Sequence, residues 1–250
     1  GADAANFVQY LTCRDISSCA VNQCKYALLL NTEGGIVCDP IILRLEKNKF
    51  WISTSDCDLE LWIKGVNVNS GLNVNIHDAN VSLLQIQGPK SSALLTKMFG
   101  EQISKLKYYW LEKLKFKDIN LIISRTGWSG ELGYEIYLSE FDKGTYLFNQ
   151  ILEAGKEFSI SVGAVNQARR IESGILSWGV DMSQNENPFQ VGLGRLVETE
   201  TRDNFIGKKA IIELSKLKQK KVLVGMKLNT KIFLNNETSW NIKKDSMIIG

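Results

Sequence analysis

The segment 124–137, with the sequence SRTGWSGELGYEIY, combines three glycines with a strand-like alternation at its end. Glycine reaches positive φ without steric cost, so this density predicts tight turns or a close approach of the backbone to a ligand. Trp128, Glu131 and Glu135 lie in the same segment. A flat ring beside a carboxylate suits a flat, nitrogen-rich ligand, because the ring stacks and the carboxylate accepts two N–H bonds. A glycine-rich turn with a core tryptophan explains the same residues without a ligand.

The rest of the chain alternates between helical and strand-like patterns. A Gly34-Gly35 turn joins two of the strands, and Asp39-Pro40 marks a break within the second. Hairpins and crossovers together favour the α+β class. We expect helices at 2–12, 57–67, 91–99, 144–158 and 166–176, and strands at 26–30, 36–45, 50–53, 81–87, 114–124, 134–138 and 222–228.

Composition excludes several function classes. The net charge of +3 gives no general electrostatic support for nucleic-acid binding, and the late lysines are interpreted as a solvated helix face. No apolar run approaches the ~18 residues of a membrane span. The chain has one histidine, His77, so multi-histidine metal sites are excluded, and no metal is expected. With a single histidine, the chain offers few residues for a metal centre or for a histidine-activated nucleophile, so we expect its reaction to depend on a cofactor.

The five cysteines lie within the first quarter of the chain and contain no C-x-x-C pair. Because five is odd, complete intramolecular pairing is impossible. We therefore interpret them as thiols in a reducing compartment and expect a cytoplasmic location.

Several motifs in a fixed order resemble the folate-binding aminomethyltransferase superfamily. Its members include the glycine-cleavage T protein and the dimethylsulfoniopropionate (DMSP) demethylase. The segment 124–137 resembles the family signature S-R-T-G-[YW]-[TS]-G-E-x-G-[FY]-E. The other matching segments are GADAANF at 1–7, YLTCRD at 10–15, NTEGGIVCD at 31–39, QIQGP at 85–89, RIESG at 170–174, NPFQVGL at 187–193 and FIGK at 205–208.

The resemblance implies a fold of three subdomains around a central folate hole. It implies a folate-binding domain over residues 1–220, with its N-terminal part missing. Residues 221–250 are expected to begin a truncated C-terminal β-barrel, since Val222, Val224, Met226 and Leu228 alternate with other residues at period two. Both ends of the chain therefore look truncated.

The resemblance also assigns site residues. Asp39 matches the aspartate nearest the reacting folate nitrogens and is the predicted catalytic residue. Glu135 matches the glutamate that grips the pterin, where two N–H donors in one plane require an acid. Tyr26, Ile41 and Trp128 match residues that line the folate pocket, although ordinary core packing explains Tyr26 and Ile41 equally well.

One position separates two branches of the family. Glycine-cleavage T proteins carry an arginine four residues before the arginine of R-I-E-S-G, whereas Asn166 stands there in this chain, as in the DMSP demethylases. The spacing from Gly130 to Gly133 instead matches the T proteins. The resemblance implies an enzyme that uses tetrahydrofolate and a small-molecule donor, with methyl transfer from a sulfonium or similar onium compound favoured.

Two alternatives remain open. The first is the aminomethyltransferase of glycine cleavage, which alone would require a lipoyl carrier protein as partner. The second is a non-enzymatic folate-binding factor for iron–sulfur assembly. Its usual cysteine motif is replaced here by residues 125–131.

Overall fold

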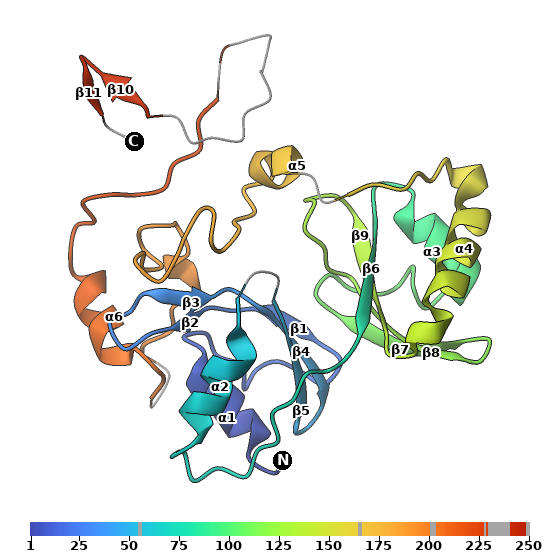
Figure 1. Cartoon of the computed structure of the whole chain (residues 1–250), viewed down its shortest axis with the longest axis horizontal. Coiled ribbons are helices and arrows are strands. Elements are labelled where there is room, and N and C mark those ends of the chain that lie inside the picture. The colour runs from blue at the N-terminus through green and yellow to red at the C-terminus, as the bar shows by residue number, and fades with distance from the viewer. Residues whose placement is uncertain (55–56, 165–166, 201–203, 228, 230–240, 249–250) are drawn as a thin grey trace.

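The computed structural model describes residues 1–54, 57–164, 167–200, 204–227, 229 and 241–248, which form a mixed α and β structure (Figure 1). The helices are α1 (Ala4–Leu11), α2 (Leu59–Asn67), α3 (Ser91–Phe99), α4 (Gly144–Gly155), α5 (Gln167–Glu172) and α6 (Lys208–Ser215), with 3₁₀ turns η1 (Phe141–Lys143), η2 (Lys156–Phe158) and η3 (Gly194–Leu196). The strands are β1 (Cys24–Tyr26), β2 (Leu29–Leu30), β3 (Ile36–Cys38), β4 (Ile41–Glu46), β5 (Lys49–Ser53), β6 (Ser82–Gln87), β7 (Leu111–Phe116), β8 (Ile119–Ser124), β9 (Gly133–Leu138), β10 (Lys243–Lys244) and β11 (Met247–Ile248).

The first sheet has the order β1-β4-β5, and the pair β2-β3 continues its hairpin beyond a break. The predicted strands 26–30 and 36–45 are each divided in two, because Pro40 carries no N–H with which to continue the ladder. Ala27 N–H instead donates to Pro40 O at 3.0 Å. The break at Asp39-Pro40 is therefore confirmed, and it positions Asp39 outside the regular ladder.

The second sheet is antiparallel throughout, in the order β6-β9-β8-β7. On β9, Tyr134, Ile136 and Leu138 point to one face and pack with apolar residues of α3 and α4. The alternate residues Glu135 and Tyr137 point to the opposite face, where Tyr137 packs against residues of the first sheet. Figure 1 shows α3 and α4 on the outer side of this sheet.

One predicted strand in this sheet is wrong in extent. The range 114–124 is a hairpin, in which β7 and β8 are joined at Lys117 and Asp118. Lys117 has a φ of +55° without being glycine, so the turn has no glycine or proline signal in the sequence.

The predicted helix 166–176 is shorter in the structure, where α5 ends at Glu172 and Gly174 follows with a φ of +67°. Ile171 on this helix is 61% exposed. The segment after α5 is irregular and contributes Met182, Leu193 and Leu196 to a core shared with β2, β3 and α6.

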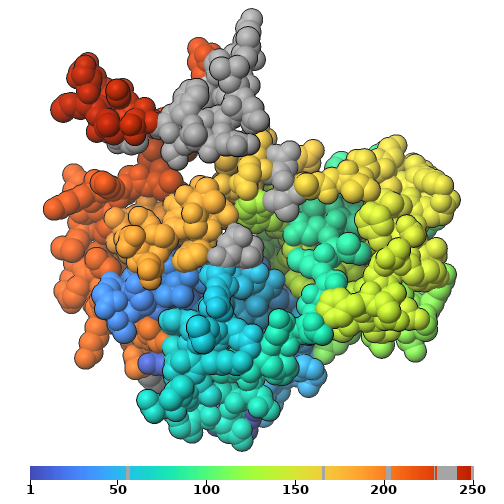
Figure 2. All heavy atoms as spheres, viewed as in Figure 1, coloured from blue at the N-terminus to red at the C-terminus, as the bar shows by residue number. Residues whose placement is uncertain are grey.

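The predicted strand 222–228 is wrong over its described residues 222–227, which form no regular structure. Val222, Val224 and Met226 are all more than half exposed. Leu223 N–H donates to Gln190 O at 2.7 Å, but among the described residues no strand pairs with this segment, and a strand needs such a partner. The short hairpin β10-β11 stands clear of both larger sheets (Figures 1 and 2).

Candidate functional site

Asp39 and Tyr26 meet at the point where the β1-β4 ladder begins. The Tyr26 hydroxyl donates to Asp39 Oδ2 at 2.8 Å. Ile41 lies directly opposite Tyr26 in the β1-β4 register, two residues after Asp39. The structure therefore brings together three of the residues that the sequence predicts for the site.

The Tyr26 hydroxyl is held in its protonated form. Burial, the negative charge of Asp39 and the hydrogen bond to Asp39 all raise the pKa of Tyr26 far above its ordinary value. Tyr26 consequently stays a hydrogen-bond donor at every physiological pH, and it fixes one oxygen of the Asp39 carboxylate. Such a fixed carboxylate is preorganised toward whatever ligand group its remaining lone pairs face.

Glu135 lies near the middle of β9 and is only 8% exposed. Its Oε1 accepts a hydrogen bond of 2.8 Å from Gln85 Nε2, which lies directly opposite on β6. Its Oε2 accepts hydrogen bonds from Thr126 Oγ1 and, at 3.4 Å, from Tyr137 OH. Burial raises the pKa of Glu135 above its ordinary value, and these hydrogen bonds oppose the rise.

The hydrogen bonds of Glu135 decide how it is able to hold a ligand. A carboxylate has about four lone-pair positions, and the protein already uses three of them. One position remains on Oε1. A ligand that presents two N–H groups in one plane must therefore take this position and displace the weakest donor, which is Tyr137 at 3.4 Å.

The strands that carry Tyr26 and Glu135 meet at the interface between the two sheets. Cys24, two residues before Tyr26, and Tyr137, two residues after Glu135, pack in one buried cluster, and Ile41 packs against it. The rings of Trp51 and Tyr137 also meet across this interface, with centroids 5.6 Å apart. Side chains two apart on a strand share a face, so Glu135 faces this interface, whereas the Tyr26 ring packs against the core that includes Leu30 and Met182.

Trp128 connects the glycine-rich segment to the irregular region after α5. Its Nε1–H donates to Leu176 O at 3.4 Å, and the Arg170 guanidinium lies 5.3 Å from the ring centroid. Arg170 is 2% exposed and forms an ion pair with Asp181. A cation already covers one face of the indole, so at most the other face is left for a ligand.

The three glycines of the segment make room for the protein's own side chains. A Cβ at Gly127 or Gly133 would lie within 2.4 Å of the Gln87 side chain. A Cβ at Gly130, whose φ is +72°, would lie 1.9 Å from Ser173 Oγ. The glycines thus fix a loop around Gln87, which accepts a 2.7 Å hydrogen bond from Ser129 Oγ. The sequence predicted that the glycines serve tight turns or the close approach of a ligand. In the structure, they are explained by close packing against the side chains of Gln87 and Ser173.

Sequence reasoning missed the partners of Glu135, namely Gln85, Thr126 and Tyr137. Two of these partners carry a sequence signal, since Gln85 is a polar residue among the leucines and isoleucine of β6 and Thr126 belongs to the glycine motif. Asn166, the remaining predicted site residue, lies outside the described residues.

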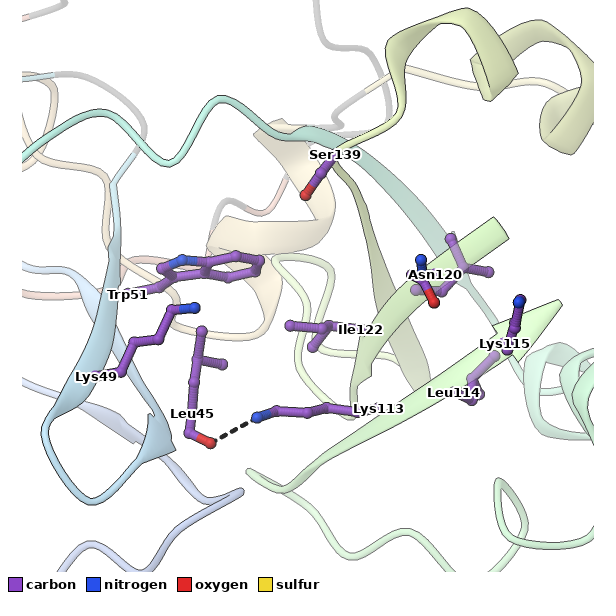
Figure 3. Close-up of a pocket in the computed structure, with 10 residues that line it drawn as sticks. Leu45, Lys49, Trp51, Lys113, Leu114, Lys115, Asn120, Ile122 and Ser139 are labelled. Atoms are coloured by element: carbon purple, nitrogen blue, oxygen red, sulfur yellow. Dashed lines mark hydrogen bonds between the residues drawn. The ribbon is translucent and has the colours of Figure 1, made fainter. Parts of the chain in front are cut away.

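A groove of about 560 Å³ opens at the far end of the same interface (Figure 3). Three lysine side chains and the indole of Trp51 line it, and Lys113 Nζ donates to Leu45 O at 2.7 Å. None of the predicted site residues lines this groove. Its lining residues are Leu45, Lys49, Trp51, Lys113, Leu114, Lys115, Asn120, Leu121, Ile122 and Ser139.

Two further features of the described residues bear on function. Among them, no three histidine, cysteine, aspartate or glutamate side chains are grouped so as to hold a metal ion. In the same part of the chain, every helix is too short or too polar to cross a membrane.

The family model for the GCVT N-terminal domain matches residues 1–201. The chain belongs to this family. The GCVT N-terminal domain family thus covers both sheets and the predicted site residues from Tyr26 to Asn166. The resemblance in the sequence motifs is confirmed.

Curated relatives carry two different names. The chain is 32% identical over 216 residues to the dimethylsulfoniopropionate demethylase DmdA of Ruegeria pomeroyi, covering 86% of this chain and 59% of that protein. It is 31% identical over 234 residues to an aminomethyltransferase of Caldanaerobacter subterraneus, covering 91% of this chain and 62% of the relative. The chain thus spans about three fifths of the length of these relatives.

A solved structure supports the fold. The glycine cleavage system aminomethyltransferase T from Bartonella henselae matches with a TM-score of 0.72 and 24% sequence identity, covering 86% of this chain and 59% of that one. The predicted α+β fold of the aminomethyltransferases is therefore confirmed.

Proposed function

We propose that this chain is the folate-binding part of a tetrahydrofolate-dependent one-carbon transferase. The observation that carries the proposal is the buried Glu135 carboxylate on β9, on the strand face that Tyr137 presents to the first sheet. A buried carboxylate with one unused acceptor position suits a neutral heterocycle edge that offers N–H groups. The proposed reaction is methyl transfer from a sulfonium or similar onium donor.

The residues fit tetrahydrofolate by their chemistry. Glu135 would hold the pterin through the unused position on Oε1 and the position that Tyr137 yields on Oε2. Tetrahydrofolate supplies the nitrogen that accepts the one-carbon unit. The part of the folate pocket that Ile41 forms would be apolar, since Ile41 packs against the cluster that contains Tyr137.

Asp39 would orient the reacting end of the folate. The Tyr26 hydroxyl donates to Asp39 Oδ2, so the carboxylate keeps a fixed direction. A fixed negative charge close to the reacting atoms also attracts a cationic donor. Because the half-buried Tyr26 already holds Asp39 by a hydrogen bond, this pair needs little reorganisation when a ligand binds.

One observation favours an onium donor. Asn166 stands where the family resemblance places an arginine in the T proteins. An arginine at that position would repel a sulfonium cation, whereas asparagine would not. Trp128 offers at most one face to such a cation, because Arg170 covers the other.

The aminomethyltransferase reaction of glycine cleavage is the second candidate. Relatives with that name are 30% to 33% identical and cover 91% to 100% of this chain, so overall identity does not separate the two functions. The spacing from Gly130 to Gly133 also matches the T-protein pattern. Under this candidate, the donor is an aminomethyl group on a lipoyl carrier protein.

The folate product distinguishes the candidates. We expect the purified protein, incubated with tetrahydrofolate and DMSP or a similar onium compound, to form 5-methyl-tetrahydrofolate, identified by chromatography and mass spectrometry. Formation of 5,10-methylene-tetrahydrofolate from an aminomethyl-lipoyl carrier, without turnover of any onium donor, would establish the second candidate instead. Folate binding without either product would indicate the non-enzymatic alternative.

A further inference from the structure

Two cysteine thiols lie in contact beside the proposed site. Cys57 Sγ is hydrogen-bonded to Cys38 Sγ at 2.7 Å. The Thr54 hydroxyl bridges the pair, at 3.0 Å from Cys38 Sγ and 3.2 Å from Cys57 Sγ. The sulfur–sulfur distance is thus within 1 Å of the ~2.05 Å length of an S–S bond. Cys19 Sγ, in contrast, donates to the backbone oxygens of Ala20 and Gln23.

The pair connects two elements at the edge of the pocket. Cys38 ends β3, lies opposite Leu29 of β2 and directly precedes Asp39. Cys57 precedes α2, and its carbonyl accepts a hydrogen bond of 2.9 Å from Leu59 N–H. A covalent link between these sulfur atoms would therefore fix the position of β3 relative to α2, one residue away from Asp39.

The two thiols differ in accessibility. Cys38 is 1% exposed, whereas Cys57 is half-buried, so a small oxidant reaches Cys57 first. The hydrogen bond to Cys57, together with burial, raises the pKa of the Cys38 thiol far above its ordinary value. Cys38 therefore stays protonated and does not react first with peroxide, and its contact with Cys57 Sγ places it to attack that sulfur once it is oxidised.

We propose that Cys38 and Cys57 are an oxidation site at which a peroxide forms a reversible disulfide that weakens the adjacent folate pocket. Cys57 sulfur attacks one oxygen of hydrogen peroxide, which gives a sulfenic acid and releases one water. Cys38 sulfur then attacks the sulfenic sulfur, and the S–S bond forms as a second water leaves. Two thiols lose two electrons and two protons, and one peroxide becomes two waters. The effect on folate rests on the proposed function.

Disulfide mapping tests the chemistry without reference to folate. The purified protein is treated with hydrogen peroxide, denatured, alkylated with N-ethylmaleimide and digested without reductant. We expect mass spectrometry to find a peptide pair that joins Cys38 to Cys57, and dithiothreitol to release it. If Cys38 and Cys57 are instead both found alkylated and unlinked after peroxide treatment of the unmutated protein, the proposal is overturned.

Single substitutions provide the controls. Cys57→Ser should abolish the linked peptide, and Cys57→Ala repeats the test should the serine variant fail to fold. Cys19→Ser is the matched control, because Cys19 is buried but hydrogen-bonds to Gln23 O instead of to a thiol. The Cys19→Ser variant should keep the Cys38–Cys57 link.

Folate affinity measures the consequence for the pocket. We expect oxidation to weaken tetrahydrofolate binding on the order of fivefold or more, as for ordinary coupling between two sites, and reduction to restore it. In Cys57→Ser, peroxide should leave the affinity unchanged. A linked protein with unaltered affinity would overturn the coupling. Absence of folate binding in the reduced protein would instead count against the proposed function, while the mapped disulfide would stand.

Discussion

Replacement of Glu135 by glutamine tests the centre of the proposed site with a change of one atom. In the variant, the amide oxygen keeps the 2.8 Å hydrogen bond from Gln85, and the amide nitrogen faces Thr126 and Tyr137. Both of these partners are hydroxyls, which rotate to accept a hydrogen bond. The protein network therefore survives, and we expect the free energy of unfolding to change by about 1 kcal/mol, the difference between a charged and a neutral hydrogen bond.

The ligand experiences a larger change. One of the two acceptors proposed for the pterin becomes an N–H donor, so a charge-assisted hydrogen bond is lost and two donors face each other. We expect a loss of about 2–4 kcal/mol of tetrahydrofolate affinity, a factor of roughly 30 to 700 in Kd. Isothermal titration calorimetry measures the affinity, and urea unfolding confirms that the variant is folded.

Glu131→Gln provides the matched control for this prediction. Glu131 lies in the same glycine-rich segment, but its side chain is exposed and precedes β9. The same chemical change should leave folate affinity unaltered there. An unchanged affinity in Glu135→Gln, or an equal loss in both variants, would refute the assignment of Glu135 as the pterin ligand.

Four further predictions follow from the same structure. Because burial raises the pKa of Glu135, its protonation stabilises the fold below the ordinary pKa of 4.5, and this contribution is lost as pH rises through the raised pKa. Urea unfolding should show the free energy of unfolding of the native protein falling over this pH range relative to that of Glu135→Gln. Folate affinity should rise over the same range, as the carboxylate forms. Asp39→Asn should reduce the turnover rate more than folate affinity, and equal losses would indicate a structural aspartate. Arg170→Ala should lower the free energy of unfolding by about 3 kcal/mol, because it leaves the Asp181 charge unpaired; a loss below about 1 kcal/mol in urea would contradict this. Asn166→Arg should slow turnover of an onium donor, and an unchanged rate in a product assay would remove Asn166 from the argument about the donor.

The sequence by itself determined the family and most of the elements. Hydrophobic periodicity and local sequence pattern predicted the helices α1, α2, α3 and α4 and the strands β5, β6 and β9 close to their observed bounds. These signals are local, since each depends on residues within one or two turns of helix or along one strand. The prediction was wrong where the local signal is absent or incomplete. The β7-β8 hairpin turns at Lys117 without glycine, and the segment 222–227 has strand periodicity but no described partner strand.

The motifs likewise indicated Asp39 and Glu135, but not the groups that control them. Gln85 reaches Glu135 because β6 and β9 pair in one particular register, fifty residues apart in the chain. The contact of Cys38 with Cys57 and the cation on Trp128 depend in the same way on segments that meet only after folding. Register and packing are set by the whole hydrophobic core, so only the tertiary structure decided which donors surround each carboxylate.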